Sequence, residues 1–62
     1  KAKLERVIGA MPEKSREVFL MNRIEKLPYR EIAVRLDLSQ KAIEKRMGVA
    51  LTFLREKLGR KI

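Results

Sequence analysis

Apolar residues recur along most of this chain at spacings of three and four, which is the period of an amphipathic helix. No stretch of useful length alternates apolar and polar residues as a strand would. The pattern predicts four helices, over residues 2–10, 12–27, 28–36 and 40–58. We therefore expect an all-α domain of four helices.

The expected helix boundaries carry residues that suit them. Pro12 and Pro28 fit the first turn of a helix, where the missing N–H would have no partner anyway. Ser39 is a good N-cap, and Gly59 is a suitable stop. The second helix should be the most buried because its apolar stripe is the widest: Val18, Phe19, Leu20, Met21, Ile24 and Leu27. The inward stripe of the last helix comprises Ile43, Met47, Ala50, Leu51, Leu54 and Leu58.

Residues 29–48 fit a helix-turn-helix, in which two short helices cross through a tight turn. Ala33 supplies the small residue where the second helix passes close to the first. Asp37 belongs to the residue types that tolerate a left-handed backbone, and Leu38 can turn back toward the core. Ile43 supplies the apolar anchor one turn into the second helix. Ile32 and Leu36 complete the predicted motif.

Charge suggests the class of partner. The chain has 62 residues and a formal net charge of +8. Residues 39–62 hold seven Lys and Arg against two Asp and Glu. A basic patch on a small helical domain favours nucleic acid as the partner, and an acidic membrane second. A solvated helix surface is the plain alternative.

No apolar run is long enough to span a bilayer, so we expect a cytoplasmic protein with no membrane partner.

Composition argues against enzymatic chemistry. The sequence contains no Cys and no His, which removes disulfides and the commonest metal and acid–base ligands. It also contains no glycine-rich loop that could hold a phosphate. We expect no enzyme, no cofactor and no metal.

If the motif is a helix-turn-helix, the outward face at the start of its second helix should meet base edges in the major groove. Gln can pair with adenine, Lys with guanine acceptors, and Glu can accept from the cytosine amino group. Lys and Arg can also bind phosphates. Tyr29 and Arg30, at the start of the shorter helix of the motif, are candidates for contacts with the flanking DNA backbone. The predicted DNA-binding residues are Tyr29, Arg30, Ser39, Gln40, Lys41, Glu44, Lys45 and Arg46.

Gly48 is unusual because glycine inside a helix costs about 1 kcal/mol relative to alanine. It could permit close approach of DNA or of a neighbouring helix. The other interpretation, which we favour, is an exposed position at which glycine has no role.

Two segments, MPEKSREVFLMNRIEKLPYREIA and RLDLSQKAIEKRMGVALTFLREKL, resemble region 4 of extracytoplasmic-function bacterial sigma factors. The resemblance covers roughly residues 11–58. Lys26 and Asp37 replace glycines that are usual in the turns of that family, and Gly48 and Val49 stand where larger or basic residues are common. The matching residues are Met11, Pro12, Arg16, Glu17, Val18, Phe19, Tyr29, Glu31, Ile32, Ala33, Leu38, Ser39, Ile43, Arg46, Ala50, Leu54 and Arg55.

The resemblance implies that the domain binds the −35 element of promoter DNA while docked on the β flap of RNA polymerase, and that an anti-sigma factor can mask it. In the family, base contacts come from positions corresponding to Gln40 through Lys45, and to Gly48 and Val49. The resemblance also implies one monomeric domain that forms part of a longer bacterial sigma factor, since region 2 is missing from these residues.

Two alternatives stay open on sequence alone. A LuxR-like output domain has a similar helix layout, but it dimerises through its last helix, where Arg55, Lys57, Arg60 and Lys61 would repel their copies. A protein-interaction module could instead present an apolar patch formed by Leu20, Val49 and Phe53.

Overall fold

The computed structural model describes the backbone of residues 2–59 and the side chains of residues 4–59. It contains helices α1 (Ala2–Ala10), α2 (Glu13–Arg23), α3 (Tyr29–Leu36) and α4 (Gln40–Leu58), and no strand occurs in this part of the chain. The prediction of an all-α domain of four helices is confirmed. Arg60 and Lys61, which were expected near the end of the last helix, lie outside the described residues.

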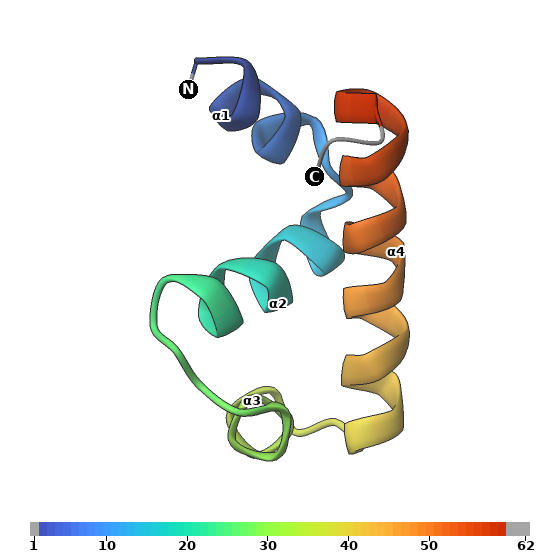
Figure 1. Cartoon of the computed structure of the whole chain (residues 1–62). Helices are drawn as coiled ribbons and strands as arrows, with labels where there is room; N and C mark the ends of the chain where they lie inside the picture. Colours follow the sequence, from blue (N-terminus) through green and yellow to red (C-terminus); the bar gives the residue numbers. More distant parts are fainter. Residues whose placement is uncertain (1, 60–62) are drawn as a thin grey trace.

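Helix α4 is the axis of the fold. Its 19 residues span about 28 Å, close to the longest dimension of the molecule, 31 Å. The other three helices lie along one side of it and each packs against it (Figure 1). Ile43, Met47, Ala50 and Leu54 are buried at spacings of four, three and four, as an inward helical stripe requires.

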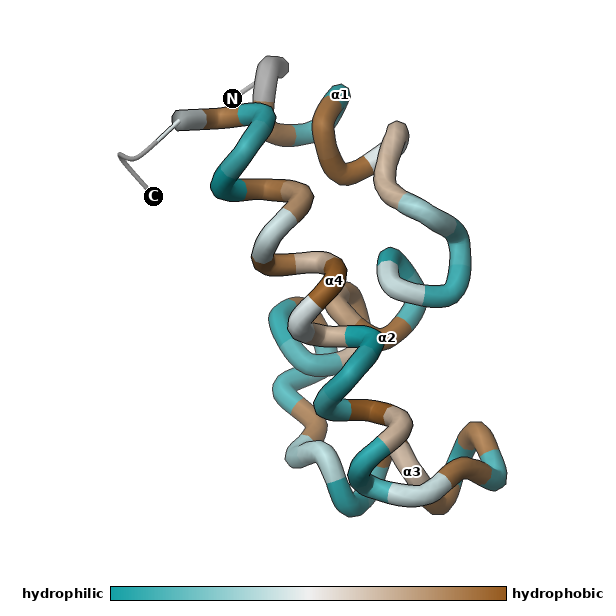
Figure 2. The backbone as a smooth tube through the Cα atoms, turned by 90° about the vertical axis from the view of Figure 1, so that its right-hand side faces the viewer, coloured by the Kyte–Doolittle hydropathy of each residue, from teal (hydrophilic) through white to brown (hydrophobic). Residues whose placement is uncertain are grey.

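The buried core is formed by α2, α3, α4 and the connection after α1, and α1 itself contributes only partly buried residues. The core comprises Met11, Val18, Phe19, Ile32, Ala33, Ile43, Met47, Ala50 and Leu54. Figure 2 looks onto the outer side of α4, where hydrophilic and hydrophobic backbone segments alternate along the helix. This alternation is expected of a helix that buries one face only.

The connection between α1 and α2 is short and held by specific contacts. The Met11 backbone N–H donates to the carbonyl of Ile8 at 3.1 Å, and the Met11 side chain is buried. Nη1 of Arg16 donates to the carbonyl of Gly9 at 2.9 Å, which satisfies a free carbonyl at the end of α1. The predicted helix starts at Pro12 and Pro28 are one residue early, since each proline is the N-cap of the helix that follows it.

The predicted extent of the second helix is wrong. Helix α2 ends at Arg23, and Ile24 is 72% exposed although it continues the apolar stripe. Beyond it, Lys26 adopts a left-handed backbone with φ 59°. The Leu27 N–H then donates to the carbonyl of Met21 at 3.1 Å, and Nδ2 of Asn22 donates to the Leu27 carbonyl at 2.9 Å. This turn brings Leu27 back against the core and leaves Ile24 outside.

The stripe predicted for α4 is also too wide at one position. Leu51 is 37% exposed, because it lies beside the line formed by Ala50 and Leu54 rather than on it. Leu4 of α1 is 44% exposed in the same region of the molecule. Both residues line a surface groove.

Candidate nucleic-acid interface

The turn between α3 and α4 has the geometry expected of a helix-turn-helix. Asp37 takes the left-handed conformation, with φ 57° and ψ 47°. The Asp37 N–H donates to the carbonyl of Val34 at 3.2 Å, and the Leu38 N–H donates to the carbonyl of Ala33 at 2.9 Å. These two bonds form a Schellman motif, which ends α3 and reverses the chain within one residue. The role predicted for Asp37 is confirmed.

Ser39 begins α4 in the predicted way. Its backbone is extended, and its Oγ accepts a hydrogen bond from the Ala42 N–H at 3.1 Å. The Ile43 N–H donates to the Ser39 carbonyl at 3.2 Å, which is the first bond along the helix. The cap satisfies one of the four N–H groups that have no partner inside the helix. The bend at residues 37–39 is therefore fixed by hydrogen bonds on both sides.

Packing fixes the angle between the two helices. Ile32 and Ile43 are fully buried, and Ala33 is 6% exposed beside them. Leu38 is half-buried and packs against this core. A larger residue at position 33 would have to fit into this packed core, so alanine suits the buried position. The predicted core positions of Ile32, Ala33, Leu38 and Ile43 are confirmed.

The structure places most of the predicted DNA-binding residues on the surface. Ser39, Gln40, Lys41, Glu44 and Lys45 are exposed at the start of α4. The flanking residues differ in burial. Arg30 is exposed at the start of α3, Arg46 is half-buried on α4, and Tyr29 is half-buried against the core.

The charges on this surface are only partly paired. In the part of the chain that the structure describes, the one salt bridge joins Nε of Arg35 to Oε2 of Glu31 on α3 at 3.5 Å. Lys41 and Lys45 lie one turn apart on α4, and its first turn contains no acidic residue. The N-terminus of a helix carries the positive end of the helix dipole. The exposed start of α4 therefore suits an anionic partner.

Residues 1–54 match the family model for region 4 of sigma-70 factors. The chain belongs to this family. No curated protein and no solved structure matches it. Sigma region 4 is a helix-turn-helix domain that binds promoter DNA in transcription initiation, acts with RNA polymerase and has no enzymatic role. The match decides against the LuxR-like alternative.

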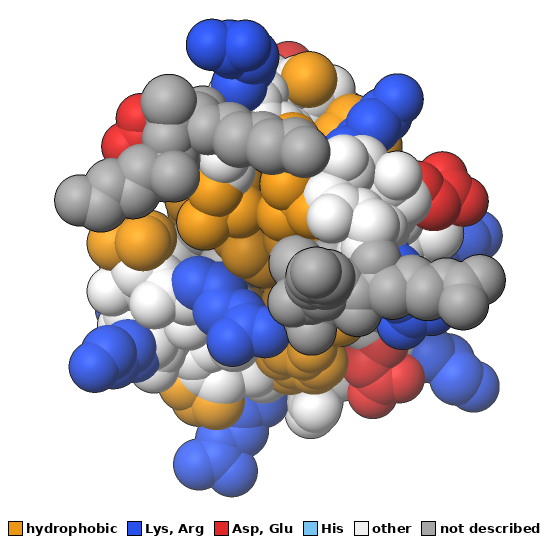
Figure 3. Space-filling model, turned by 45° about the horizontal axis from the view of Figure 1, so that its top comes forward, with side chains coloured by type: hydrophobic (Ala, Val, Ile, Leu, Met, Phe, Trp, Pro, Cys, Tyr) orange, Lys and Arg blue, Asp and Glu red, His pale blue; other side chains and the backbone are white. Residues whose placement is uncertain are grey.

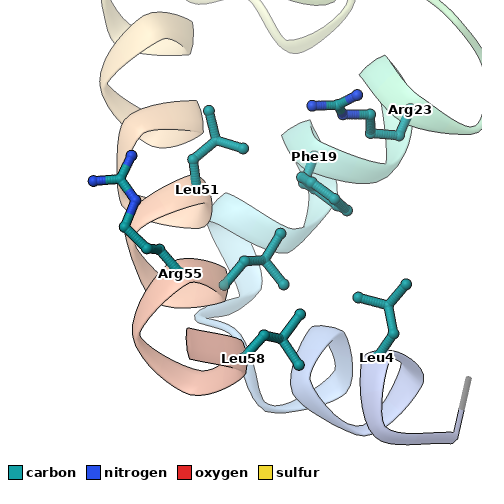
Figure 4. A pocket seen from close by; sticks show the side chains of 7 residues that line it. Leu4, Phe19, Arg23, Leu51, Arg55 and Leu58 are labelled. Carbon is teal, nitrogen blue, oxygen red and sulfur yellow. The ribbon is translucent and has the colours of Figure 1, made fainter. Parts of the chain in front are cut away.

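This region 4 also contains an apolar groove that sequence reasoning missed. It has a volume of about 450 Å³ and lies between α1, α2 and the C-terminal half of α4. Arg23 of α2 and Arg55 of α4 lie on opposite sides of it (Figure 4). Figure 3 looks onto the end of the molecule where α1 and the end of α4 lie, and hydrophobic side chains gather there with Lys and Arg around them. The groove is lined by Leu4, Phe19, Arg23, Leu51, Leu54, Arg55 and Leu58.

Periodicity had assigned Leu51, Leu54 and Leu58 of this groove to the inward stripe of the last helix. The signal that could have separated them is the width of the stripe on α4, since a helix face holding both Ala50 and Leu51 is too wide for one line of contacts. Cζ of Arg23 lies 5.8 Å from the centre of the Phe19 ring, which holds the guanidinium beside the groove.

The predicted apolar patch of Leu20, Val49 and Phe53 is present only in part. Val49 is 45% exposed and Phe53 is half-buried, and both line a shallow recess on α4. Leu20 is not among its lining residues. Nζ of Lys57 lies 5.6 Å from the centre of the Phe53 ring.

Gly48 lines the same recess. A Cβ atom added there would meet nothing within 4 Å, so no neighbouring helix of this chain requires glycine at this position.

The described residues contain no group of three Asp or Glu that could hold a metal ion. No helix among them is long and apolar enough to cross a membrane.

Proposed function

We propose that this region 4 binds the −35 element of a promoter as part of a sigma factor of the extracytoplasmic-function type. The observation that carries the proposal is the bend at residues 37–39, which leaves Gln40, Lys41, Glu44 and Lys45 exposed at the start of a helix anchored by the buried Ile43. A recognition helix needs such an exposed first turn to reach base edges in the major groove. The match to sigma region 4 supports promoter DNA as the class of target.

The residue types divide into two roles. Gln40 can pair with adenine, and Lys41 and Lys45 can donate to the O6 and N7 acceptors of guanine. Arg30, Arg46 and the phenol of Tyr29 lie at the flanks, where contacts to phosphates fix the register of the domain. In this proposal the exposed N-terminus of α4, which Ser39 caps, also contacts a phosphate.

The groove between α1, α2 and α4 suits a second partner. A short helix could place its apolar face against Leu4, Leu51 and Leu58, and carboxylates beside that face could pair with Arg23 and Arg55. In this proposal the occupant is the β flap of RNA polymerase. An anti-sigma factor that covers the same groove would then compete with the polymerase, and the domain would act as a monomer.

Fluorescence anisotropy with labelled duplex DNA tests the DNA-binding part. If four or five phosphates are contacted, the logarithm of the affinity should fall with the logarithm of salt concentration with a slope of roughly −4. Lys41→Ala and Lys45→Ala should each weaken binding and make that slope shallower. Lys14→Ala is the matched control, because it removes an exposed lysine from α2, outside the α3–α4 unit. Absence of duplex binding at low salt would contradict the proposal.

A binding assay with a purified β-flap segment tests the groove. Leu51→Lys places a charge among the apolar lining residues and should abolish flap binding without changing DNA binding. Ile24→Lys is the control, since Ile24 is exposed and apolar but does not line the groove. Equal flap binding by both variants would exclude the groove as the docking surface.

A further inference from the structure

Glu44 is the one acidic residue in the first two turns of α4, and it lies on the surface that carries Lys41 and Lys45. It is exposed, and it takes no part in the salt bridge found among residues 4–59. The positions four residues away in either direction are Gln40 and Gly48, so the one cation at helix-pairing spacing is Lys41, three residues before it, and the structure forms no salt bridge between the two. By contrast, Glu31 on α3 is paired with Arg35 at i+4.

A carboxylate at this place is unfavourable against DNA of arbitrary sequence. The phosphates repel it, and a surface that only binds the backbone would be improved by its removal. A hydrogen-bond donor on a base edge is what can offset this repulsion. In the major groove such donors are the N4 amino group of cytosine and the N6 amino group of adenine.

The surroundings of Glu44 favour cytosine over adenine. The N6 amino group of adenine lies beside N7, an acceptor that repels a carboxylate and would be better matched by an amide. The N4 amino group of cytosine faces the groove beside the O6 and N7 acceptors of its paired guanine. Lys41 lies three residues before Glu44 on the same face of α4, so its ammonium group can donate to that guanine. The Glu44 carboxylate and a lysine ammonium group together match the donor and the acceptors of one C·G pair.

We propose that Glu44 is a specificity-determining residue that accepts a hydrogen bond from the N4 amino group of a cytosine in the promoter element. Lys41 or Lys45 binds the guanine of the same or the adjacent base pair. This inference rests on the proposed binding of duplex DNA by the start of α4, and it adds to that function a base preference assigned to one side chain.

Selection from a randomised duplex library, followed by sequencing of the bound fraction, tests this inference with the 62-residue chain. The two variants to compare with the wild type are Glu44→Gln and Glu56→Gln. Both replace an exposed glutamate of α4 and remove one negative charge, but Glu56 lies three turns further along the helix. Circular dichroism of all three proteins shows whether the fold is retained.

The wild type should enrich one C·G pair by roughly fivefold to tenfold over the other base pairs at that position. Glu44→Gln should lose that preference, or change it toward adenine, and keep the preferences at other positions. Glu56→Gln should keep the wild-type pattern. The inference is overturned if both variants bind all duplexes more tightly and show unchanged preferences, because Glu44 is then only a solvated charge. Absence of any enrichment by the wild type instead contradicts the proposed function itself, and this inference with it.

Discussion

The backbone N–H of Leu38 donates to the carbonyl of Ala33 at 2.9 Å, across a left-handed Asp37. This bond links Ala33, which is buried in the core, with Leu38, the apolar residue that returns the turn to the core. Because Ser39 begins α4 directly after it, the bond helps to set the direction in which α4 leaves the turn. The orientation of the candidate recognition surface therefore depends on this tight turn together with the packing of α3 against α4.

The left-handed turn predicts a stabilising substitution. Asp37→Gly should raise the free energy of unfolding by about 0.5–1 kcal/mol, because glycine adopts a positive φ without steric cost. Asp37→Ala should lower it, since alanine tolerates that conformation less well than aspartate does. Urea denaturation followed by circular dichroism measures both. Equal stability of the two variants would contradict this account of the turn.

The hydrogen bond from Ala42 to Ser39 predicts separate effects on stability and on DNA affinity. Ser39→Ala should lower the free energy of unfolding by about 1 kcal/mol, since it removes the N-cap. Ser39→Asp keeps a capping oxygen and should fold normally, but its charge should weaken duplex binding at low salt. Thermal denaturation and anisotropy titrations distinguish the two effects. If Ser39→Asp both unfolds more easily and binds DNA weakly, the weak binding reflects loss of the fold, and the predicted effect of charge on DNA affinity is contradicted.

The burial of Ala33 predicts a steric effect that its exposed neighbour Val34 should lack. Ala33→Leu should lower the free energy of unfolding by about 1–3 kcal/mol, because the added atoms must fit between packed helices. Val34→Leu is the matched control: Val34 precedes the same turn, is 75% exposed, and should tolerate the change within about 0.5 kcal/mol. Denaturant titration measures the free energy of unfolding of both variants. Equal values for the two would contradict tight packing at Ala33.

Gly48 inside α4 and Gly59 at its C-cap predict opposite responses to alanine. Gly48→Ala should raise the free energy of unfolding by about 1 kcal/mol, because the new Cβ meets no atom and alanine favours the helix. Gly59→Ala should lower it, since Gly59 caps the helix with φ 81°. Thermal denaturation of both variants tests this. If Gly48→Ala is less stable than Gly59→Ala, the conclusion that a Cβ atom fits freely at position 48 is contradicted.

Several features of the fold follow from local chemistry and were predictable from the sequence. The bounds of α1, α3 and α4 follow from helical periodicity together with Pro28 and Ser39. The turn follows from Asp37 and Leu38, because few residue types accept a positive φ and an apolar residue after it returns to the core. The candidate DNA-binding surface follows too, since exposed and buried positions of a helix are fixed once Ile43 is its anchor.

The end of α2 and the apolar groove were decided by tertiary structure. Ile24 and Leu27 both continue the stripe of α2, so the pattern alone could not show that Lys26 would turn the chain and leave Ile24 in solvent. Likewise, Leu51 and Leu4 are apolar at helical spacing, yet they border a space that α1, α2 and α4 enclose together. Periodicity reports which face of a helix is apolar. How far that face is covered depends on the neighbouring helices, whose positions are set by long-range packing.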